Sequence, residues 1–111
     1  MRVVNIKAGF RRADHPDHMF ELVVIMRPRI LGNPFVMRSE ADRELVIEQF
    51  RQHLWKDIQR NGPMKKELDR LRGCEKQGRE VILMCCCKPA PCHGDIIINA
   101  VNWLNKQEVK T

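Results

Sequence analysis

The chain is 111 residues long, with 43% hydrophobic residues, 31% charged residues and a formal net charge of +6. This length excludes two independent cores, and the composition excludes a wholly disordered chain. We therefore expect one domain over residues 1–111, with its core at about residues 2–105 and a short polar C-terminal tail. The positive charge favours anionic partners, namely a small anionic molecule, a nucleotide or nucleic acid.

The apolar runs of the chain are far shorter than the roughly 18 to 20 residues that span a bilayer. The first residues, Met-Arg-Val-Val-Asn-Ile-Lys, also lack the apolar centre of a secretion signal. The sequence therefore predicts a cytoplasmic protein without a membrane partner.

The N-terminal third predicts two strands, each followed by a loop. Residues 2–6 are typical of a short strand, and the polar residues 7–18 indicate a loop. Residues 22–26, Leu-Val-Val-Ile-Met, have no alternating polar face, so we expect a strand that is buried on both sides and ends before Pro28. Residues 32–35, Gly-Asn-Pro-Phe, predict a turn.

Helical spacing begins near Asp42 and continues to residue 58. Residues 61–63, Asn-Gly-Pro, follow as a stop signal, so the sequence predicts a long helix before them. A second, shorter helix is expected after Pro63, with its end at Gly73. The apolar positions of the long helix are Val46, Ile47, Phe50, Leu54, Trp55 and Ile58.

The C-terminal third predicts a third strand and a last helix. Residues 81–84, Val-Ile-Leu-Met, are apolar throughout, so we expect them in the middle of the sheet. Residues 97–104 then carry apolar side chains at helical spacing. Trp55 and Trp103 both fall in helical patterns, and we expect them to cover the core.

The predicted order is strand, strand, helix, helix, strand, helix. Strands separated by helices of this length favour a mostly parallel sheet covered on both faces, so we predict an α/β fold, a single small Rossmann-like three-layer sandwich. Ligands of such sheets bind beyond the carboxyl ends of the strands. The segment 85–95, Cys-Cys-Cys-Lys-Pro-Ala-Pro-Cys-His-Gly-Asp, falls at this edge.

The segment 85–95 joins the third strand to the last helix. Pro89 and Pro91 restrict the backbone there, so we expect Cys92 and His93 to be held in a defined place. The chain has five cysteines, an odd number, and three of them are consecutive, which favours free thiols in a reducing compartment. Three kinds of chemistry are compatible with this pattern.

The first kind of chemistry is an anion or nucleotide pocket. The Lys88 ammonium and the backbone amides at the start of the helix would receive a phosphate, and Gly94 would allow close approach to the backbone. Asp95 would fill the anion position itself or contact a ribose hydroxyl. Cys87 shares the strand face of Cys85 and would line the same pocket.

The second kind is thiol catalysis. Cys92 lies beside His93 and a helix N-terminus, so we expect a lowered pKa and a nucleophilic thiolate. His93 would act as acid or base, and Asp95 as a proton acceptor. These three residues are the predicted catalytic set.

The third kind is a zinc site formed by Cys85, Cys87, Cys92 and His93, which are ligand types that zinc prefers. The corresponding function is a zinc-stabilised, non-enzymatic protein that binds nucleic acid or a host protein. A purely structural role is also compatible with the pattern, with the cysteines as small buried hydrophobes and His93 at a helix cap.

Three strings of the sequence resemble the domain-of-unknown-function family 4326, which is frequent in phages and bacteria. They are Gly-Asn-Pro-Phe at 32–35, Asp-Arg at 42–43, and Cys-x-Cys-x-Pro-x-Pro-Cys-His-Gly-Asp at 85–95, in the family's order. The chain departs from the family at Met26, where a glycine is usual, and at Cys86, where an aromatic residue is usual.

The resemblance implies that Arg27 and Asn33 belong to the same site as the Cys-His turn. Each follows a strand, and they supply a forked donor and an amide suited to a phosphate, a carboxylate or a base edge. The leading hypothesis is a ligand-binding or catalytic pocket for a nucleotide, a nucleoside or a nucleic-acid-related anion. Its residues would be Arg27, Asn33, Cys87, Cys92, His93 and Asp95.

Overall fold

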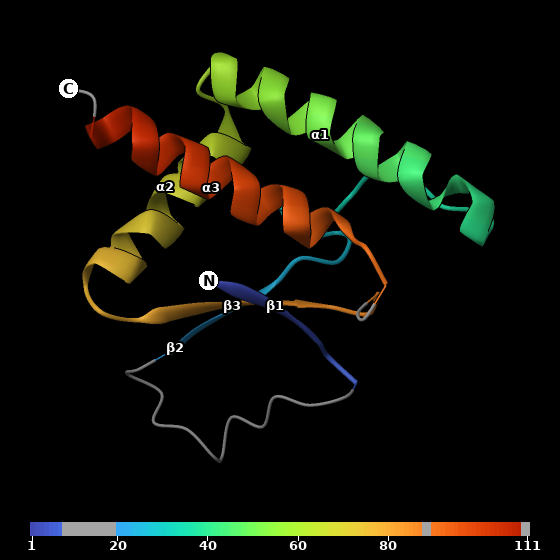
Figure 1. Ribbon diagram of the computed structural model, residues 1–111, viewed down its shortest axis with the longest axis horizontal. Coiled ribbons are helices and arrows are strands. Elements are labelled where there is room, and N and C mark those ends of the chain that lie inside the picture. The colour runs from blue at the N-terminus through green and yellow to red at the C-terminus, as the bar shows by residue number, and fades with distance from the viewer. Residues whose placement is uncertain (8–19, 88–89, 110–111) are drawn as a thin grey trace.

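The computed structural model describes residues 1–7, 20–87 and 90–109, so the predicted loop over residues 7–18 lies outside the described residues except for Lys7. Those residues form three strands and three α-helices, which confirms the α/β class (Figure 1). The elements are β1 (Arg2–Asn5), β2 (Phe20–Val24), the short 3-10 helix η3 (Glu40–Asp42), α1 (Arg43–Gln59), α2 (Pro63–Lys76), β3 (Glu80–Cys85) and α3 (His93–Val109).

The three strands form one parallel sheet in the order β1-β3-β2. Leu83 of β3 is opposite Val3 on one side and Val23 on the other, which confirms that the third strand is central. β2 is an edge strand, so Leu22 and Val24 are half-buried. The prediction that this strand is buried on both sides was wrong, because Val23 faces the helices and joins the core, whereas Leu22 and Val24 point to the face that the described helices do not cover.

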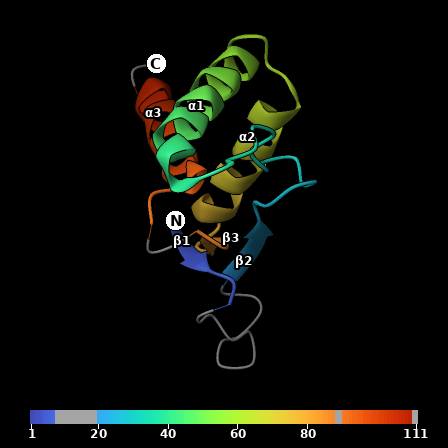
Figure 2. The same ribbon diagram turned by 90° about the vertical axis from the view of Figure 1, so that its right-hand side faces the viewer.

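The helices of the described residues all lie on one side of the sheet, as Figures 1 and 2 show. Side chains of β3 alternate, so Val81, Leu83 and Cys85 join the core beneath the helices, whereas Ile82 lies outside that cluster. We expected helices on both faces. Instead α2 and α3 pack on the sheet, and α1 packs on α2 and α3, so the third layer is a helix lying over other helices.

The junction between α1 and α2 is stabilised by a buried carboxylate. α2 begins at Pro63 after Gly62, which has no side chain to cap the helix. Asp57 of α1, only 3% exposed, accepts the Lys65 N–H at 2.8 Å in its place. A Cβ on Gly62 would collide with this carboxylate. The Asn-Gly-Pro sequence after α1 thus ends one helix and leaves room to cap the next.

α2 runs past the predicted end at Gly73 and stops at Lys76. The prediction was wrong because Cys74 is buried in the core, and this packing carries the helix through the glycine. The chain turns instead at Gly78, whose φ of 86° lies in the left-handed region. The last helix also extends beyond the predicted apolar stretch, to Val109.

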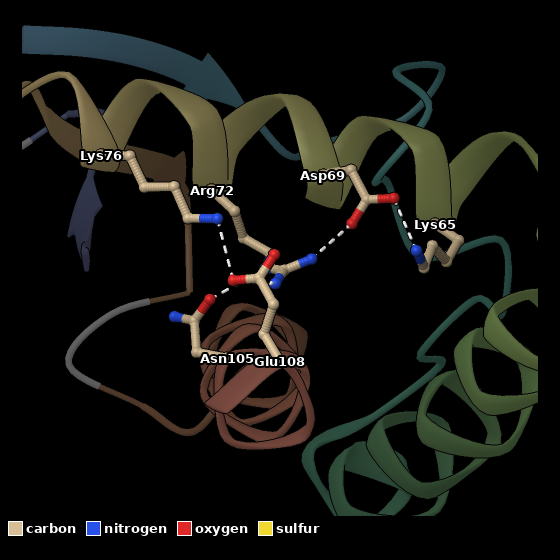
Figure 3. Close-up of polar contacts among 6 residues, drawn as sticks. All are labelled: Lys65, Asp69, Arg72, Lys76, Asn105 and Glu108. Atoms are coloured by element: carbon tan, nitrogen blue, oxygen red, sulfur yellow. Dashed lines mark hydrogen bonds and ion pairs between the residues drawn. The ribbon is translucent and has the colours of Figure 1, made fainter. Parts of the chain in front are cut away.

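Arg72 joins α2 to α3 (Figure 3). Its Nε donates to Asn105 Oδ1 at 2.8 Å, and its other nitrogens lie within ion-pair distance of Asp69 and Glu108. Lys76 also contacts Glu108, at 2.8 Å. The guanidinium is almost wholly buried, and these partners compensate for its loss of solvent.

Trp55 of α1 and Trp103 of α3 meet edge to face, with ring centroids 5.2 Å apart. Their side chains are 42% and 41% exposed, so the expectation that they cover the core was wrong. They flank a shallow pocket of about 200 Å³ between the two helices. No helix in the described part of the chain is long and apolar enough to cross a membrane.

Candidate functional site

A pocket of about 390 Å³ opens at the carboxyl ends of β2 and β3, beside the start of α3. This is the edge of the sheet at which ligands of parallel α/β folds bind. Of the predicted site residues it brings together Arg27, Asn33, Cys85, Cys87, Cys92 and His93. Lys88 lies outside the described residues.

Cys92 and Asp95 cap the N-terminus of α3. Cys92 immediately precedes the helix, and its Sγ accepts the Gly94 N–H at 3.3 Å. Asp95, in the first turn, reaches back with Oδ2 to accept the Cys92 N–H at 3.3 Å. The pattern resembles a capping box, with a thiol in place of the usual hydroxyl and with the amide of the second helical residue, not the third, as its donor. The carboxylate of Asp95 therefore serves the helix end and does not line the pocket.

The protonation of Cys92 differs from our expectation. Burial raises the pKa of this thiol well above its ordinary value, and the adjacent Cys85 thiol raises the pKa further. The hydrogen bond from Gly94 N–H acts in the opposite direction but is outweighed. The prediction of a lowered pKa was wrong, since the turn places the sulfur inside the protein and not at an exposed helix end.

His93 ties the start of α3 to the end of β2. Its Nε2 lies 2.6 Å from the Ile25 carbonyl oxygen, and because that oxygen can only accept, Nε2 is the donor. The ring also meets Phe50 of α1 edge to face, with centroids 4.9 Å apart. Burial lowers the pKa of His93, the carbonyls of Ile25 and Leu31 partly offset this, and the imidazole is therefore neutral at neutral pH.

The buried His93 predicts a loss of stability in mild acid. The pKa of His93 is depressed in the folded state and is about 6.5 in the unfolded chain, so unfolding takes up a proton below that pH. The His93 contribution to the free energy of unfolding should be constant above about pH 6.5 and should be lost progressively as the pH falls below about 6.5. Urea titrations at pH values on both sides of 6.5 measure it. His93→Gln should flatten the dependence and His53→Gln should retain it; an unchanged slope in His93→Gln would contradict the assignment.

Gly94 allows α3 to begin against the sheet. A Cβ at this position would lie 2.8 Å from Val3 Cγ2 and 3.0 Å from Ile25 Cδ1. We expected a glycine that admits a ligand to the backbone. The close approach that it permits here is to side chains of β1 and of the segment after β2.

Asn33 and Arg27 form a second wall of the pocket. Asn33 Oδ1 accepts the Phe35 N–H at 2.9 Å, and its amide donates to the Val46 carbonyl of α1 at 3.2 Å, so the side chain holds the turn to the helix. Arg27 Nη1 donates to the Asn33 carbonyl at 3.1 Å. This bond orients the exposed guanidinium of Arg27 at the rim of the pocket.

Arg43, which we did not predict as a site residue, also lines the pocket. Its Nη1 donates to the Pro91 carbonyl at 2.9 Å, and its fork binds both oxygens of Glu40. Arg43 also contacts Cys87. Burial raises the pKa of the Cys87 thiol, and the hydrogen bond with Arg43 partly offsets this rise. The Asp-Arg motif at 42–43 could have identified Arg43 from the sequence. Phe35, another lining residue that we did not predict, is the last residue of the Gly-Asn-Pro-Phe motif.

The four predicted zinc ligands do not assemble a metal site. Cys85 and Cys92 are close, with sulfurs 3.6 Å apart, but the His93 ring is directed to the Ile25 carbonyl. Within residues 1–7, 20–87 and 90–109, no group of three or more histidine, cysteine, aspartate or glutamate side chains is arranged to hold a metal ion. The described geometry therefore gives the zinc hypothesis no support.

Comparison with known proteins agrees with the family that the sequence resembles. A relative from Enterobacteria phage T4, described as an uncharacterized 12.4 kDa protein in the nrdA-td intergenic region, is 38% identical over 86 residues, which cover 78% of this chain and 72% of the relative. No solved structure matches the chain. The model of the domain of unknown function DUF4326 matches residues 10–103. The chain therefore belongs to the DUF4326 family.

Proposed function

We propose that the protein binds a small anionic ligand of the nucleotide class in the pocket between β2, β3 and the start of α3. One observation carries this proposal. Arg27 and Arg43, from segments far apart in the sequence, are both oriented by hydrogen bonds to backbone carbonyls at the wall of the same pocket. Paired guanidinium groups in a largely apolar cavity match a ligand with an anionic end and an apolar or planar end.

The two arginines have different roles in this proposal. Arg43 is already bonded to Glu40 and Pro91, so it shapes the wall and contributes positive potential. Arg27 is exposed at the rim, and its guanidinium would hydrogen-bond to the anion directly. The start of α3 is less suited to that task, because Cys92 and Asp95 already accept amide hydrogens there.

The apolar lining of the pocket suits the uncharged part of a nucleotide. It includes one benzene ring, that of Phe35, together with Met26, Met37, Val46 and Ile47. A base can pack on such a surface, and a cavity of about 390 Å³ falls within the usual range for small-molecule sites. The pocket supports ligand binding; the catalytic roles of Cys92, His93 and Asp95 stay predictions.

The proposal is tested by titrating the protein with nucleoside monophosphates and, separately, with inorganic phosphate, using calorimetry. Arg27→Gln should weaken binding of the monophosphate about 10-fold or more, because charged hydrogen bonds contribute roughly 1.5–3 kcal/mol. Arg29→Gln is the matched control, since it removes the same charge two residues away, outside the pocket. It should leave the dissociation constant nearly unchanged.

Two results would contradict the proposal. If no nucleoside monophosphate binds the wild-type protein, the ligand class is wrong. If Arg29→Gln weakens binding as much as Arg27→Gln, the affinity reflects the general positive charge and not this pocket. Inorganic phosphate alone should bind more weakly than a monophosphate, because it cannot use the apolar lining.

A further inference from the structure

Two thiols lie in contact at the inner wall of the pocket. Cys85 is the last residue of β3, and Cys92 immediately precedes α3. Both are free cysteines, and their sulfurs are 3.6 Å apart. The end of the strand therefore meets the start of the helix. This pair is distinct from the arginines to which we assign ligand binding.

We propose that hydroperoxides oxidise Cys85 and Cys92 to an intramolecular disulfide, which a dithiol reductant reverses. A disulfide needs a sulfur–sulfur distance of about 2.05 Å, so the two atoms must approach by about 1.5 Å from their present 3.6 Å to form the bond. Because the two thiols are already in contact, this pair is suited to oxidation to a disulfide. The bond would join β3 to α3 beside the pocket.

The reaction balances with one molecule of hydrogen peroxide, the simplest hydroperoxide, as oxidant. The Cys92 sulfur attacks one peroxide oxygen, the O–O bond breaks, and a sulfenic acid and one water form. The Cys85 sulfur then attacks the Cys92 sulfur, the S–O bond breaks, and the hydroxyl leaves as a second water with the remaining thiol proton. Two thiols and one hydrogen peroxide thus give one disulfide and two waters.

Cys92 reacts first because of its place in the pocket wall. Both cysteines line the cavity, but Cys92 retains 3% exposure whereas Cys85 is fully buried, so a small peroxide that enters the cavity would meet Cys92 first. The thiolate is the reactive form. Because burial raises the pKa of Cys92, the oxidation should be slow at neutral pH and faster in alkaline solution.

The experiment treats the folded wild-type protein with hydrogen peroxide at mildly alkaline pH and then blocks remaining thiols by alkylation. Intact mass spectrometry should show the loss of two hydrogens, and fragmentation should show that Cys85 and Cys92 are the two residues protected from alkylation. Dithiothreitol should restore both. Oxidation of the exposed Cys86 alone would instead add oxygen, so the two reactions are distinguished by mass.

Serine variants of single cysteines test which two residues form the disulfide. Cys85→Ser and Cys92→Ser should each abolish the loss of two hydrogens, whereas Cys74→Ser and Cys86→Ser should retain it. The proposal is overturned if the protected pair includes Cys86 or Cys87, if the loss survives in Cys85→Ser, or if the wild type gains oxygen without losing hydrogens. Fragmentation of the wild-type protein identifies the pair directly, so the proposal remains testable even where a serine variant folds poorly.

Discussion

Replacing Phe50 by alanine is expected to lower the free energy of unfolding by about 3–5 kcal/mol, the usual cost of deleting a fully buried aromatic side chain. Phe50 is completely buried where α1 meets α3. Its ring also contacts the His93 imidazole, with centroids 4.9 Å apart. Truncation removes apolar burial and the support of the histidine that anchors α3 to the end of β2.

Urea unfolding of Phe50→Ala and of Trp55→Ala checks this prediction. Both changes truncate an aromatic side chain on α1, but Trp55 is 42% exposed, so its truncation should cost clearly less than that of Phe50. Equal losses in the two variants would contradict the buried position of Phe50. Phe50→Leu should lose less than Phe50→Ala because it refills part of the cavity.

Replacing Gly94 by alanine is expected to lower the free energy of unfolding by about 1–3 kcal/mol, the usual cost of overpacking. Alanine in a helix normally stabilises relative to glycine by about 0.5–1 kcal/mol, so a loss here reverses the ordinary sign. The cause is the new Cβ, which would lie 2.8 Å from Val3 Cγ2. To relieve this contact, α3 or β1 must shift, and the shift would also disturb the pocket.

Gly73→Ala is the matched control for Gly94→Ala. Gly73 lies inside α2, and a Cβ there meets nothing within 4 Å. This variant should therefore raise the free energy of unfolding by about 0.5–1 kcal/mol. Thermal and urea denaturation of both variants would test whether the free energy of unfolding falls in Gly94→Ala and rises in Gly73→Ala. A gain in both would show that α3 does not begin as close to Val3 as the structure has it.

Several features of the fold followed from local sequence. The apolar spacing around Phe50 and the Asn-Gly-Pro stop predicted α1, and its observed end at Gln59 agrees. The unbroken apolar run at 81–84 predicted the central strand. These inferences succeeded because periodicity and backbone restriction act within a few residues. The same reasoning placed the end of α2 at Gly73, where tertiary burial of Cys74 overrides the weak preference of one glycine.

The location of the candidate site could also be predicted, because parallel strands carry their carboxyl ends to one edge of the sheet. The motifs and the family resemblance indicated that Cys92, His93, Arg27 and Asn33 belong together, and the pocket contains these four residues, whereas the predicted Asp95 does not line it. Apart from the family's Asp-Arg string, nothing local marked Arg43 as a wall residue, since its contact with the Pro91 carbonyl joins positions 48 residues apart.

By itself, then, the sequence determined the α/β class, the helix that carries Phe50, and the edge of the sheet where the pocket lies. Only the tertiary structure decided what each group does there. It gathered the described helices on one face, directed His93 to the Ile25 carbonyl and enclosed the Cys92 sulfur beside Cys85. Burial and hydrogen-bond partners set protonation, and both depend on contacts between segments distant in the chain.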